Sequence, residues 1–437
     1  MSQRFLIVAV LAFAPALSRA QVVVDTTAAP ISLTEAIRMA QRNAPASVQA
    51  RGTLTTSSAS VKQAYSAFLP SITVGAGTQR QQGDRFDPQG NLVPYTGQPT
   101  TYSTSLSSSF QLFDGGRRFF DLNRARADVN AAEAGETAQR YQIALQVKQQ
   151  YYASLAARES ESAANAQLDQ ATQQLKAAST RLRAGAATVS DSLRSVIQIG
   201  NARLALLNAQ NNRSVADATL TRLVASSRPV TANPADTADQ RVALPDVAEL
   251  EQLAAKAPSV LQADAQLTAA HANVRSAKSA YLPTLNLNFN RGGSGLDSRF
   301  GSGDARYAYN QNISFSLNFP LFNNLNREMS VVRANVAEET AAAAFRDTKF
   351  LARQTLVQSL GQMRTAQQQV DIQVASVAAA QEDLRVQQRR YELGATTLLD
   401  LLTSQSQLDQ ARASLIRARY DYRIAKAQLE ALIGRDL

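Results

Sequence analysis

Residue types that commonly carry chemistry are scarce in this chain. Its 437 residues include no Cys and a single His, His271. Without cysteine there are no disulfides, thiol nucleophiles or Cys-ligated metals. Met39, Met329 and Met363 are too far apart in sequence to predict a metal relay. No clustered nucleophile, base or phosphate-binding loop appears, and His271 reads as a surface or packing residue. The sequence therefore predicts no enzyme, no cofactor and no metal site.

Two segments do combine arginine, glycine, threonine and aspartate at matching positions. Residues 181–191 read RLRAGAATVSD, and residues 390–400 read RYELGATTLLD. In each, glycine is expected to end one helix in a left-handed conformation, and threonine to cap the next helix with aspartate three residues later. Aspartate there also suits the positive end of the helix dipole. On a purely structural interpretation, helix capping accounts for Asp191 and Asp400. On the functional interpretation, the two turns form the end of a tube that another protein contacts.

A second pattern places asparagine on alternate residues of two apolar segments, 285–290 and 310–321. This period of two predicts strands with hydrocarbon on one side and water on the other. A soluble sandwich strand alternates in the same way, but its outer face usually carries Lys and Glu rather than uncharged Asn. The residues predicted to line a hydrated lumen are Asn286, Asn288, Asn290, Asn310, Asn312, Ser314, Ser316 and Asn318.

Long helices must position these strands and turns. From about Arg118 to Ala184 the chain contains no proline, so a continuous helix would reach ~100 Å. Apolar residues recur at coiled-coil spacing in this region and again near the C-terminus. An earlier helical pattern is interrupted at Ala44-Pro45. Each strand pair is expected to enclose a polar loop, at residues 80–100 and 291–306.

The chain also repeats itself. Residues 61–72 match 274–285 at an offset of 213, and residues from Phe110 onward match those from Phe319 at an offset of 209. The offset changes only between paired strands, where an exposed loop tolerates a change in length. We therefore divide the chain into a first repeat at 21–225, a connector at 226–246 and a second repeat at 247–437. Each repeat is expected to contain a helix, a β-hairpin and a long coiled-coil helical hairpin.

The first 20 residues predict a cleavable secretory signal peptide. Arg4 precedes an apolar run from Phe5 to Leu17, and small residues flank Arg19 before Gln21. No later segment approaches 18 continuous apolar residues, so a membrane would have to be crossed by strands. The formal net charge is +10, but Lys and Arg are scattered along helical patterns and the signal directs the chain away from DNA. No nucleic-acid partner is expected.

On these features the chain resembles the TolC-type outer-membrane efflux proteins over essentially its whole length after residue 20. The resemblance rests on the repeat, Leu69-Pro70 and Leu282-Pro283 before the strands, FDGGR at 113–117, PLFN at 320–323, and the two Arg-x-x-x-Gly turns. It implies a mainly α fold with a transmembrane β-barrel, assembled as a homotrimer with twelve strands and a periplasmic tunnel of helices. It also implies two partners, a periplasmic adaptor (membrane fusion) protein and an inner-membrane transporter.

The resemblance further assigns roles to single residues. Those that would contact the adaptor are Arg181, Leu182, Gly185, Arg390, Tyr391 and Gly394. Asp400 falls where well-known members place an acidic ring that gates the tunnel, and Asp191 is its equivalent in the first repeat. Thr396 and Thr403 stand where those members carry a basic gate residue and a second acid.

The expected function is a passive exit duct of a tripartite efflux or type I secretion system, in the outer membrane and in contact with its lipid. Four strands cannot close a barrel without edges, whereas twelve strands from three copies leave room for a lumen. The alternative is a soluble periplasmic coiled-coil scaffold, which leaves the asparagine-alternating strands unexplained. The sequence does not name the cargo.

Overall fold

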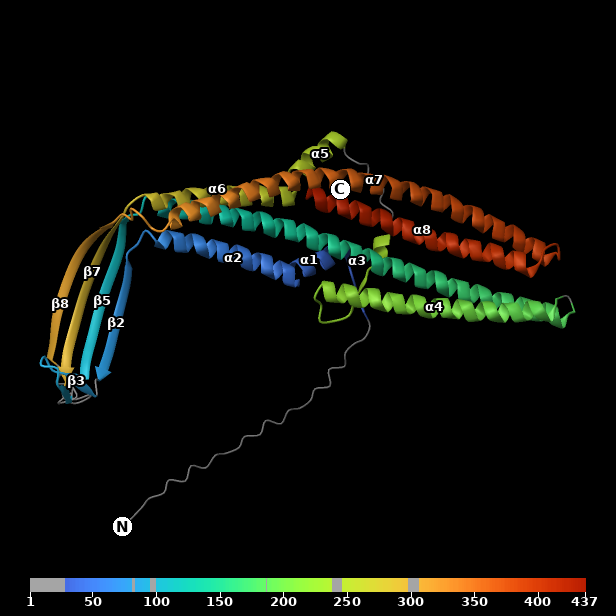
Figure 1. The fold of residues 1–437 in the computed structure, drawn as a ribbon. Coiled ribbons are helices and arrows are strands. Elements are labelled where there is room, and N and C mark those ends of the chain that lie inside the picture. The colour runs from blue at the N-terminus through green and yellow to red at the C-terminus, as the bar shows by residue number, and fades with distance from the viewer. Residues whose placement is uncertain (1–27, 81–82, 95–99, 186, 238–245, 298–305) are drawn as a thin grey trace, which may run out of the picture.

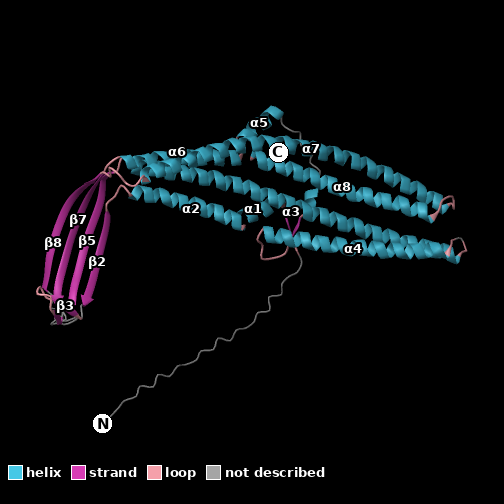
Figure 2. Cartoon of the chain, viewed as in Figure 1, coloured by secondary structure: helices cyan, strands magenta, loops and turns pink. Residues whose placement is uncertain are grey.

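The computed structural model describes residues 28–80, 83–94, 100–185, 187–237, 246–297 and 306–437. Figure 1 shows an elongated molecule, with a sheet at one end and long helices that run side by side away from it. Figure 2 shows that the long strands gather at that end. The predicted signal peptide at 1–20 lies outside the described residues.

Helices make up most of the described chain. The elements are β1 (Ala29–Ile31), α1 (Leu33–Asn43), α2 (Pro45–Ser66), β2 (Ser71–Arg80), β3 (Asp84–Phe86), β4 (Leu92–Pro94), β5 (Thr100–Phe113), α3 (Arg117–Arg183), α4 (Val189–Leu223), β6 (Val230–Ala232), the 3-10 helix η1 (Pro234–Thr237), α5 (Val247–Ala255), α6 (Pro258–Lys278), the 3-10 helix η2 (Ser279–Tyr281), β7 (Thr284–Asp297), β8 (Arg306–Asn318), α7 (Asn326–Glu392) and α8 (Leu398–Ile433). Within the described residues, none of these helices combines the length and apolarity needed to cross a membrane.

Local sequence signals set the helix ends. Ser32 caps α1, because its hydroxyl accepts the backbone N–H of Glu35 at 3.3 Å. The predicted interruption at Ala44-Pro45 is confirmed, since Pro45 ends α1 and starts α2 at the position that lacks an intrahelical N–H partner. The predicted long helix is also confirmed: α3 is 67 residues long, and so is α7.

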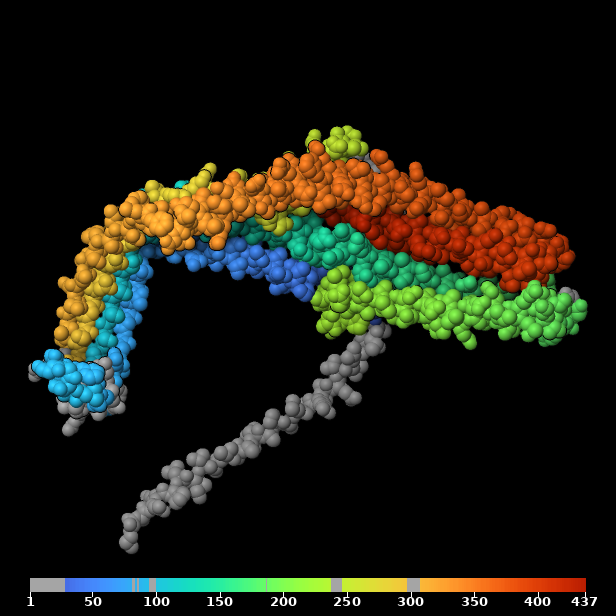
Figure 3. All heavy atoms as spheres, in the orientation of Figure 1, coloured from blue at the N-terminus to red at the C-terminus, as the bar shows by residue number. Residues whose placement is uncertain are grey.

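Two helical hairpins form the long part of the molecule. Helix α3 packs on α4, α7 packs on α8, and contacts between α3 and α8 join the two hairpins. The resulting order across this part is α4, α3, α8, α7. Closer to the sheet, the neighbours are α2 on α3, α3 on α6, and α6 on α7. Figure 3 shows these helices as one continuous body.

The large sheet is antiparallel and has the strand order β2-β5-β7-β8. Figures 1 and 3 show it projecting from the end of the helices. Side chains are exposed on both faces, including Ile72 and Phe315 on one face and Thr73 and Ser316 on the other. In a single subunit the described sheet is thus a single layer, with neither face covered.

The expected ends of two strands, β7 and β8, were wrong. Strand β7 continues to Asp297 instead of ending near Asn290, because its Gly-rich end permits close pairing: a Cβ on Gly293 would lie 2.7 Å from the Tyr309 ring. Strand β8 ends at Asn318 rather than Leu321, since Pro320 has no N–H to donate to a ladder. The expected loop between β2 and β5 also contains the short antiparallel pair β3–β4.

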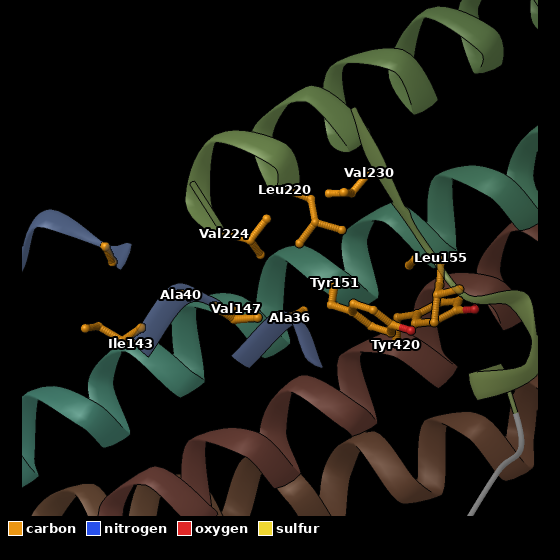
Figure 4. Packing of buried hydrophobic residues seen from close by; sticks show 12 residues of the cluster. Ala36, Ala40, Ile143, Val147, Tyr151, Leu155, Leu220, Val224, Val230 and Tyr420 are labelled. Atoms are coloured by element: carbon orange, nitrogen blue, oxygen red, sulfur yellow. The ribbon is translucent and has the colours of Figure 1, made fainter. Parts of the chain in front are cut away.

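A compact cluster surrounds the middle of α3. Strands β1 and β6 pair in parallel beside α1, and the predicted connector contributes β6 and η1 to this cluster. Figure 4 shows Tyr151 at its centre, among side chains from α1, α3, α4, β6 and α8. Residues 238–245 of the connector lie outside the described residues.

Tyr151 links the two short strands to α3. Its side chain is 0% exposed, and its hydroxyl contacts the Asp236 carboxylate and the Ile31 carbonyl oxygen, the latter at 3.0 Å. The Tyr151 hydroxyl oxygen also accepts the backbone N–H of Asn233 at 3.0 Å. Burial and the hydrogen bond to Asp236 raise the pKa of Tyr151 well above its usual value.

Replacing Tyr151 with Phe is expected to lower the free energy of unfolding by about 1–3 kcal/mol, because partly buried polar groups of Asn233 and Asp236 lose a partner. Thermal unfolding in detergent measures the effect as a lower Tm. Tyr152→Phe is the matched control, since its ring packs against the same cluster and its hydroxyl makes none of these hydrogen bonds. Equal shifts in the two variants would contradict this role of the Tyr151 hydroxyl.

Candidate functional site at the sheet faces and hairpin tips

The strand register places the predicted lumen residues on one face of the sheet. Asn286 pairs with Ser316, Asn288 with Ser314, and Asn290 with Asn312. Asn310 lies opposite Gly292 on the same face. The two segments singled out in the sequence therefore form one continuous polar surface across β7 and β8.

The first two strands extend this polar surface. Ser105, Ser107 and Ser109 of β5 pair with Gly75, Thr73 and Ser71 of β2, and Ser109 also donates a hydrogen bond to Asn288 at 3.0 Å. This serine row was not predicted from the sequence. Serine on alternate residues of β5 was the signal that would have revealed it.

The opposite face is apolar. Leu287 pairs with Phe315, Phe289 with Ile313, and Val74 with Leu106 on the other half of the sheet. Ile313 is 65% exposed, and Phe315 and Leu317 are similarly exposed. Exposed apolar side chains in this number require a cover of lipid or protein. The sheet therefore has one apolar face and one face of Asn, Ser and Thr. This arrangement suits a boundary between an apolar medium and water.

Each hairpin tip has the predicted capping geometry. Gly185 and Gly394 adopt left-handed conformations, with φ of +73° and +70°. Thr188 and Thr397 then cap α4 and α8, and each forms a reciprocal pair of hydrogen bonds with the aspartate three residues later. Glycine supplies a conformation that costs other residues energy at these turns.

Asp400 is more extensively bonded than its equivalent Asp191. One of its carboxylate oxygens accepts the hydroxyls of Thr397 at 2.7 Å and Thr396 at 2.9 Å, and the backbone N–H of Thr397 at 3.1 Å. These bonds, led by that from the Thr397 side chain, lower the pKa of Asp400. The group is exposed and carries a negative charge at neutral pH. Asp191 accepts hydrogen bonds from the hydroxyl and N–H of Thr188.

One pair of predicted docking residues links the two hairpins. The Arg181 guanidinium lies over the Tyr391 ring, 4.5 Å from its centroid. It also donates to the carbonyl oxygens of Tyr391 at 3.0 Å and Glu392 at 3.3 Å. Arg390 instead donates within its own turn, to the Ala395 carbonyl oxygen at 3.4 Å. The structure thus brings Arg181 and Tyr391 together, whereas the hydrogen bond of Arg390 stays within the second tip.

Exposure separates the remaining tip residues. Gly185 and Gly394 are exposed, and Leu182 is half-buried. Leu393, which the sequence analysis did not single out, is 83% exposed directly before Gly394. His271 lies far from the tips, on α6, where its Nδ1 is 2.7 Å from a carboxylate oxygen of Glu338 on α7.

The family of the chain follows from comparison with known proteins. The model of the outer membrane efflux protein family matches residues 36–226 and 250–435. These two segments contain both sheet halves and both helical hairpins. The chain belongs to the outer membrane efflux protein family.

Individual relatives agree with this assignment. The chain is 27% identical to the pyoverdine export outer membrane protein OpmQ of Pseudomonas putida, over 96% of this chain and 90% of that protein. It is 27% identical to protein CyaE of Bordetella pertussis, over 87% of this chain and 79% of that protein. The open-state outer membrane channel MtrE of Neisseria gonorrhoeae shares the fold, with a TM-score of 0.74 at 21% identity, over 92% of this chain and 89% of that one.

The resemblance to TolC-type proteins is therefore confirmed. The chain is an outer-membrane efflux protein, and neither an enzyme nor a soluble periplasmic scaffold.

The Arg181 contacts predict that the second hairpin tip is stabilised by the first. Arg181→Ala removes a cation–π contact and two hydrogen bonds to the second turn, so amide hydrogen exchange in residues 390–395 is expected to rise about tenfold. Hydrogen exchange followed by mass spectrometry measures this change in exchange rate along both hairpins. The control is Arg183→Ala, because its one hydrogen bond among the described residues goes to Thr180 of its own helix. Unchanged exchange at 390–395 in Arg181→Ala would show that the tips are independent.

Proposed function

We propose that this protein is the passive exit duct of a tripartite export system, built from three copies of the chain. One observation carries the proposal: the sheet is a single layer with one apolar and one polar face, and among the described residues no further strand pairs with β2 or β8 at its edges. In lipid, unpaired backbone groups at such edges cost several kcal/mol each. Pairing β2 of one copy with β8 of the next removes both edges, and three copies give a closed barrel of twelve strands.

The helices support the same arrangement. Helix α4 buries Ser195, Ala202 and Ala209 against its neighbours. Its opposite side, about 200° around the helix at Leu204, carries a second apolar stripe that is exposed in the subunit. That stripe contains Leu193, Val196, Ile197, Leu204, Leu207 and Val215. A helix that is apolar on two sides is typical of a position between two neighbours.

Helix α7 offers the matching surface at the other end of the helix order. Its exposed apolar residues at helical spacing include Phe350, Val357, Ile372 and Val386. Within one copy, α4 and α7 lie at opposite ends of the order α4, α3, α8, α7, as β2 and β8 do in the sheet. At each contact between copies, the first-repeat side of one copy (β2 and α4) would therefore meet the second-repeat side of the next (β8 and α7). Such head-to-tail contacts can close into a ring.

An internal duplication accounts for this consistency. We propose the domain limits 21–225, 226–246 and 247–437, with a copy of one ancestral unit on either side of the connector. Equal lengths of α3 and α7, and nearly equal lengths of α4 and α8, support this. The first repeat supplies one edge strand of the sheet and one outer helix of the hairpin order. The second repeat supplies the other edge strand and the other outer helix.

The polar face then lines the lumen. It presents Asn, Ser, Thr and Gly rather than charge along most of its length, so varied solutes would pass with little selection. Names of relatives point the same way, since they include export of pyoverdine and efflux of toluene and antibiotics. Cargo choice and energy would belong to an inner-membrane transporter.

The tips would meet a periplasmic adaptor protein. Gly185, Gly394 and Leu393 are exposed there, whereas Arg181 and Tyr391 are engaged with each other. We assign contact with the adaptor to the exposed turns, and assign Arg181 and Tyr391 to holding the two turns at a fixed spacing. Three copies of Asp400, with Asp191 beside them, would place carboxylates around the tunnel end.

The exposed stripe on α4 predicts a variant that fails to assemble. Leu204→Glu places one charge in each proposed contact between copies and is expected to convert most trimers to monomers, measured as particle mass by light scattering in detergent. Asn212→Glu adds the same charge on a flank of the same helix and is expected to leave trimers intact. Trimers in both variants would contradict the α4–α7 contact.

Ion selectivity tests the duct and its acidic end together. The purified protein is expected to conduct in planar bilayers and to prefer cations. Asp400→Asn keeps a side-chain oxygen for capping, and should move the reversal potential in a KCl gradient toward zero. Glu382→Gln removes an exposed charge paired with Arg385 outside the proposed ring, and serves as the control. No conductance at all would contradict the duct, and an unmoved potential would remove Asp400 from its gate.

A further inference from the structure

The apolar band on β7 and β8 is too short for a membrane. On the apolar face, the last apolar pair toward the loop end is Phe289 and Ile313, and the next pair is Arg291 and Gln311. From Phe289 back to Leu285 the strand advances ~14 Å. A tilt of ~40° shortens that further, whereas the apolar band of an outer-membrane barrel is ~25 Å tall. The paired apolar residues of β7 and β8 therefore supply about half of the required height, and on the same face Leu106 beside Arg291 and Tyr309 beside Gly293 add to it toward the loop end.

Apolar side chains continue beyond the last paired residue. We define the junction patch as Phe319, Leu321, Phe322 and Leu325, in the segment between β8 and α7. Leu321 is 82% exposed and Phe322 is 73% exposed. In sequence, Phe319 and Leu321 continue the odd-numbered series that runs through Ile313 and Leu317 on the apolar face, and they follow directly on the end of β8 at Asn318. Measured from Ile313 to Leu321, the series reaches at most ~27 Å.

We propose that phospholipid of the periplasmic leaflet covers the junction patch, so that the membrane boundary lies at the start of α7 rather than at the end of the strands. This inference rests on the proposed function, which puts the apolar face of the sheet in lipid. The junction patch continues that face and completes its height.

The backbone at Leu325 supports a selected role for its side chain. Leu325 has φ +61°, in the left-handed region that favours glycine. Its equivalent at the repeat offset of 209 is Gly116, with φ +81°. The first repeat thus uses the residue that fits this conformation, and the second uses a leucine that is 60% exposed in the subunit. Contact with lipid gives that leucine a favourable environment to offset the strain.

Two carbonyl groups of the segment are hydrogen-bonded within the protein, while Asn323 Oδ1 and Arg327 Nε are buried there with no partner among the described residues. Pro320 has no N–H, and its carbonyl oxygen accepts from Arg327 at 2.9 Å. The Leu321 carbonyl oxygen accepts from the same guanidinium at 3.3 Å. These carbonyl groups have a partner within the protein, as irregular backbone near hydrocarbon requires.

Positive charges lie at the same level. Arg117 is the first residue of α3, and Lys278 is the last residue of α6. Both side chains are exposed, at the ends of helices that meet the sheet in Figure 1, and Arg117 also lies 3.5 Å from a carboxylate oxygen of Asp121. Cations immediately beside an apolar band match the phosphate groups of phospholipid headgroups.

Spin labels at single cysteines test the proposal, because the chain has no cysteine of its own. The variants are Leu321→Cys and Leu325→Cys, with Ile313→Cys and Asn312→Cys as neighbouring references on the two sheet faces. Each is placed in vesicles of phosphatidylethanolamine and phosphatidylglycerol. Collision with oxygen, which concentrates in lipid, is compared with collision with a water-soluble nickel chelate.

Labels at 321 and 325 are expected to favour oxygen over the chelate, as the label at 313 does and the label at 312 does not. Preference for the chelate at both junction positions, with 313 still in lipid, would overturn the inference and leave the proposed function intact. Exclusion of both reagents would overturn it in favour of a neighbouring copy as the cover. A label at 313 that favours the chelate would contradict the proposed function itself.

Discussion

Backbone hydrogen bonding at the sheet edges is the constraint on which the rest of this structure depends. In the part of the subunit that the structure describes, strands β2 and β8 each leave one row of N–H and C=O groups without a strand partner. Water satisfies such groups in a soluble protein, but hydrocarbon does not. Because the chain is an outer-membrane efflux protein with an apolar sheet face, we propose that strands from other copies pair with these edges. The proposed closed ring follows from that requirement.

The helical part is consistent with the same requirement. A helix such as α4, with a small-residue seam on one side and exposed leucines on the other, gains little as part of a lone subunit and much between two neighbours. The hairpin tips depend on local chemistry instead: two glycines turn the chain, two capping pairs restart it, and the Arg181–Tyr391 contact ties one turn to the other. The long helices thus connect the membrane end with a tip whose shape is fixed locally.

Much of this architecture was predictable because its signals are periodic. Alternating Asn residues predicted the polar face of β7 and β8, proline-free segments predicted α3, and threonine with aspartate predicted the caps. Contacts between segments distant in sequence were not predictable, since nothing local marks Arg181 as a partner of Tyr391. Glycines led to the wrong end for β7, because the same residue permits both loops and close strand pairing at Gly293. The parallel β1–β6 pair is only three residues long on each side, too short to show a period.

Disulfide formation between the two sheet edges tests the central claim most directly. A chain with Thr73→Cys on β2 and one further cysteine at Asn312, Ser314 or Ser316 on β8 cannot join its own edges, because β5 and β7 lie between them. Oxidation in membranes is expected to give, for at least one of the three pairs, covalent products that end at trimers on a denaturing gel. Monomers for every pair, or a ladder that continues beyond three, would contradict a closed ring of three copies.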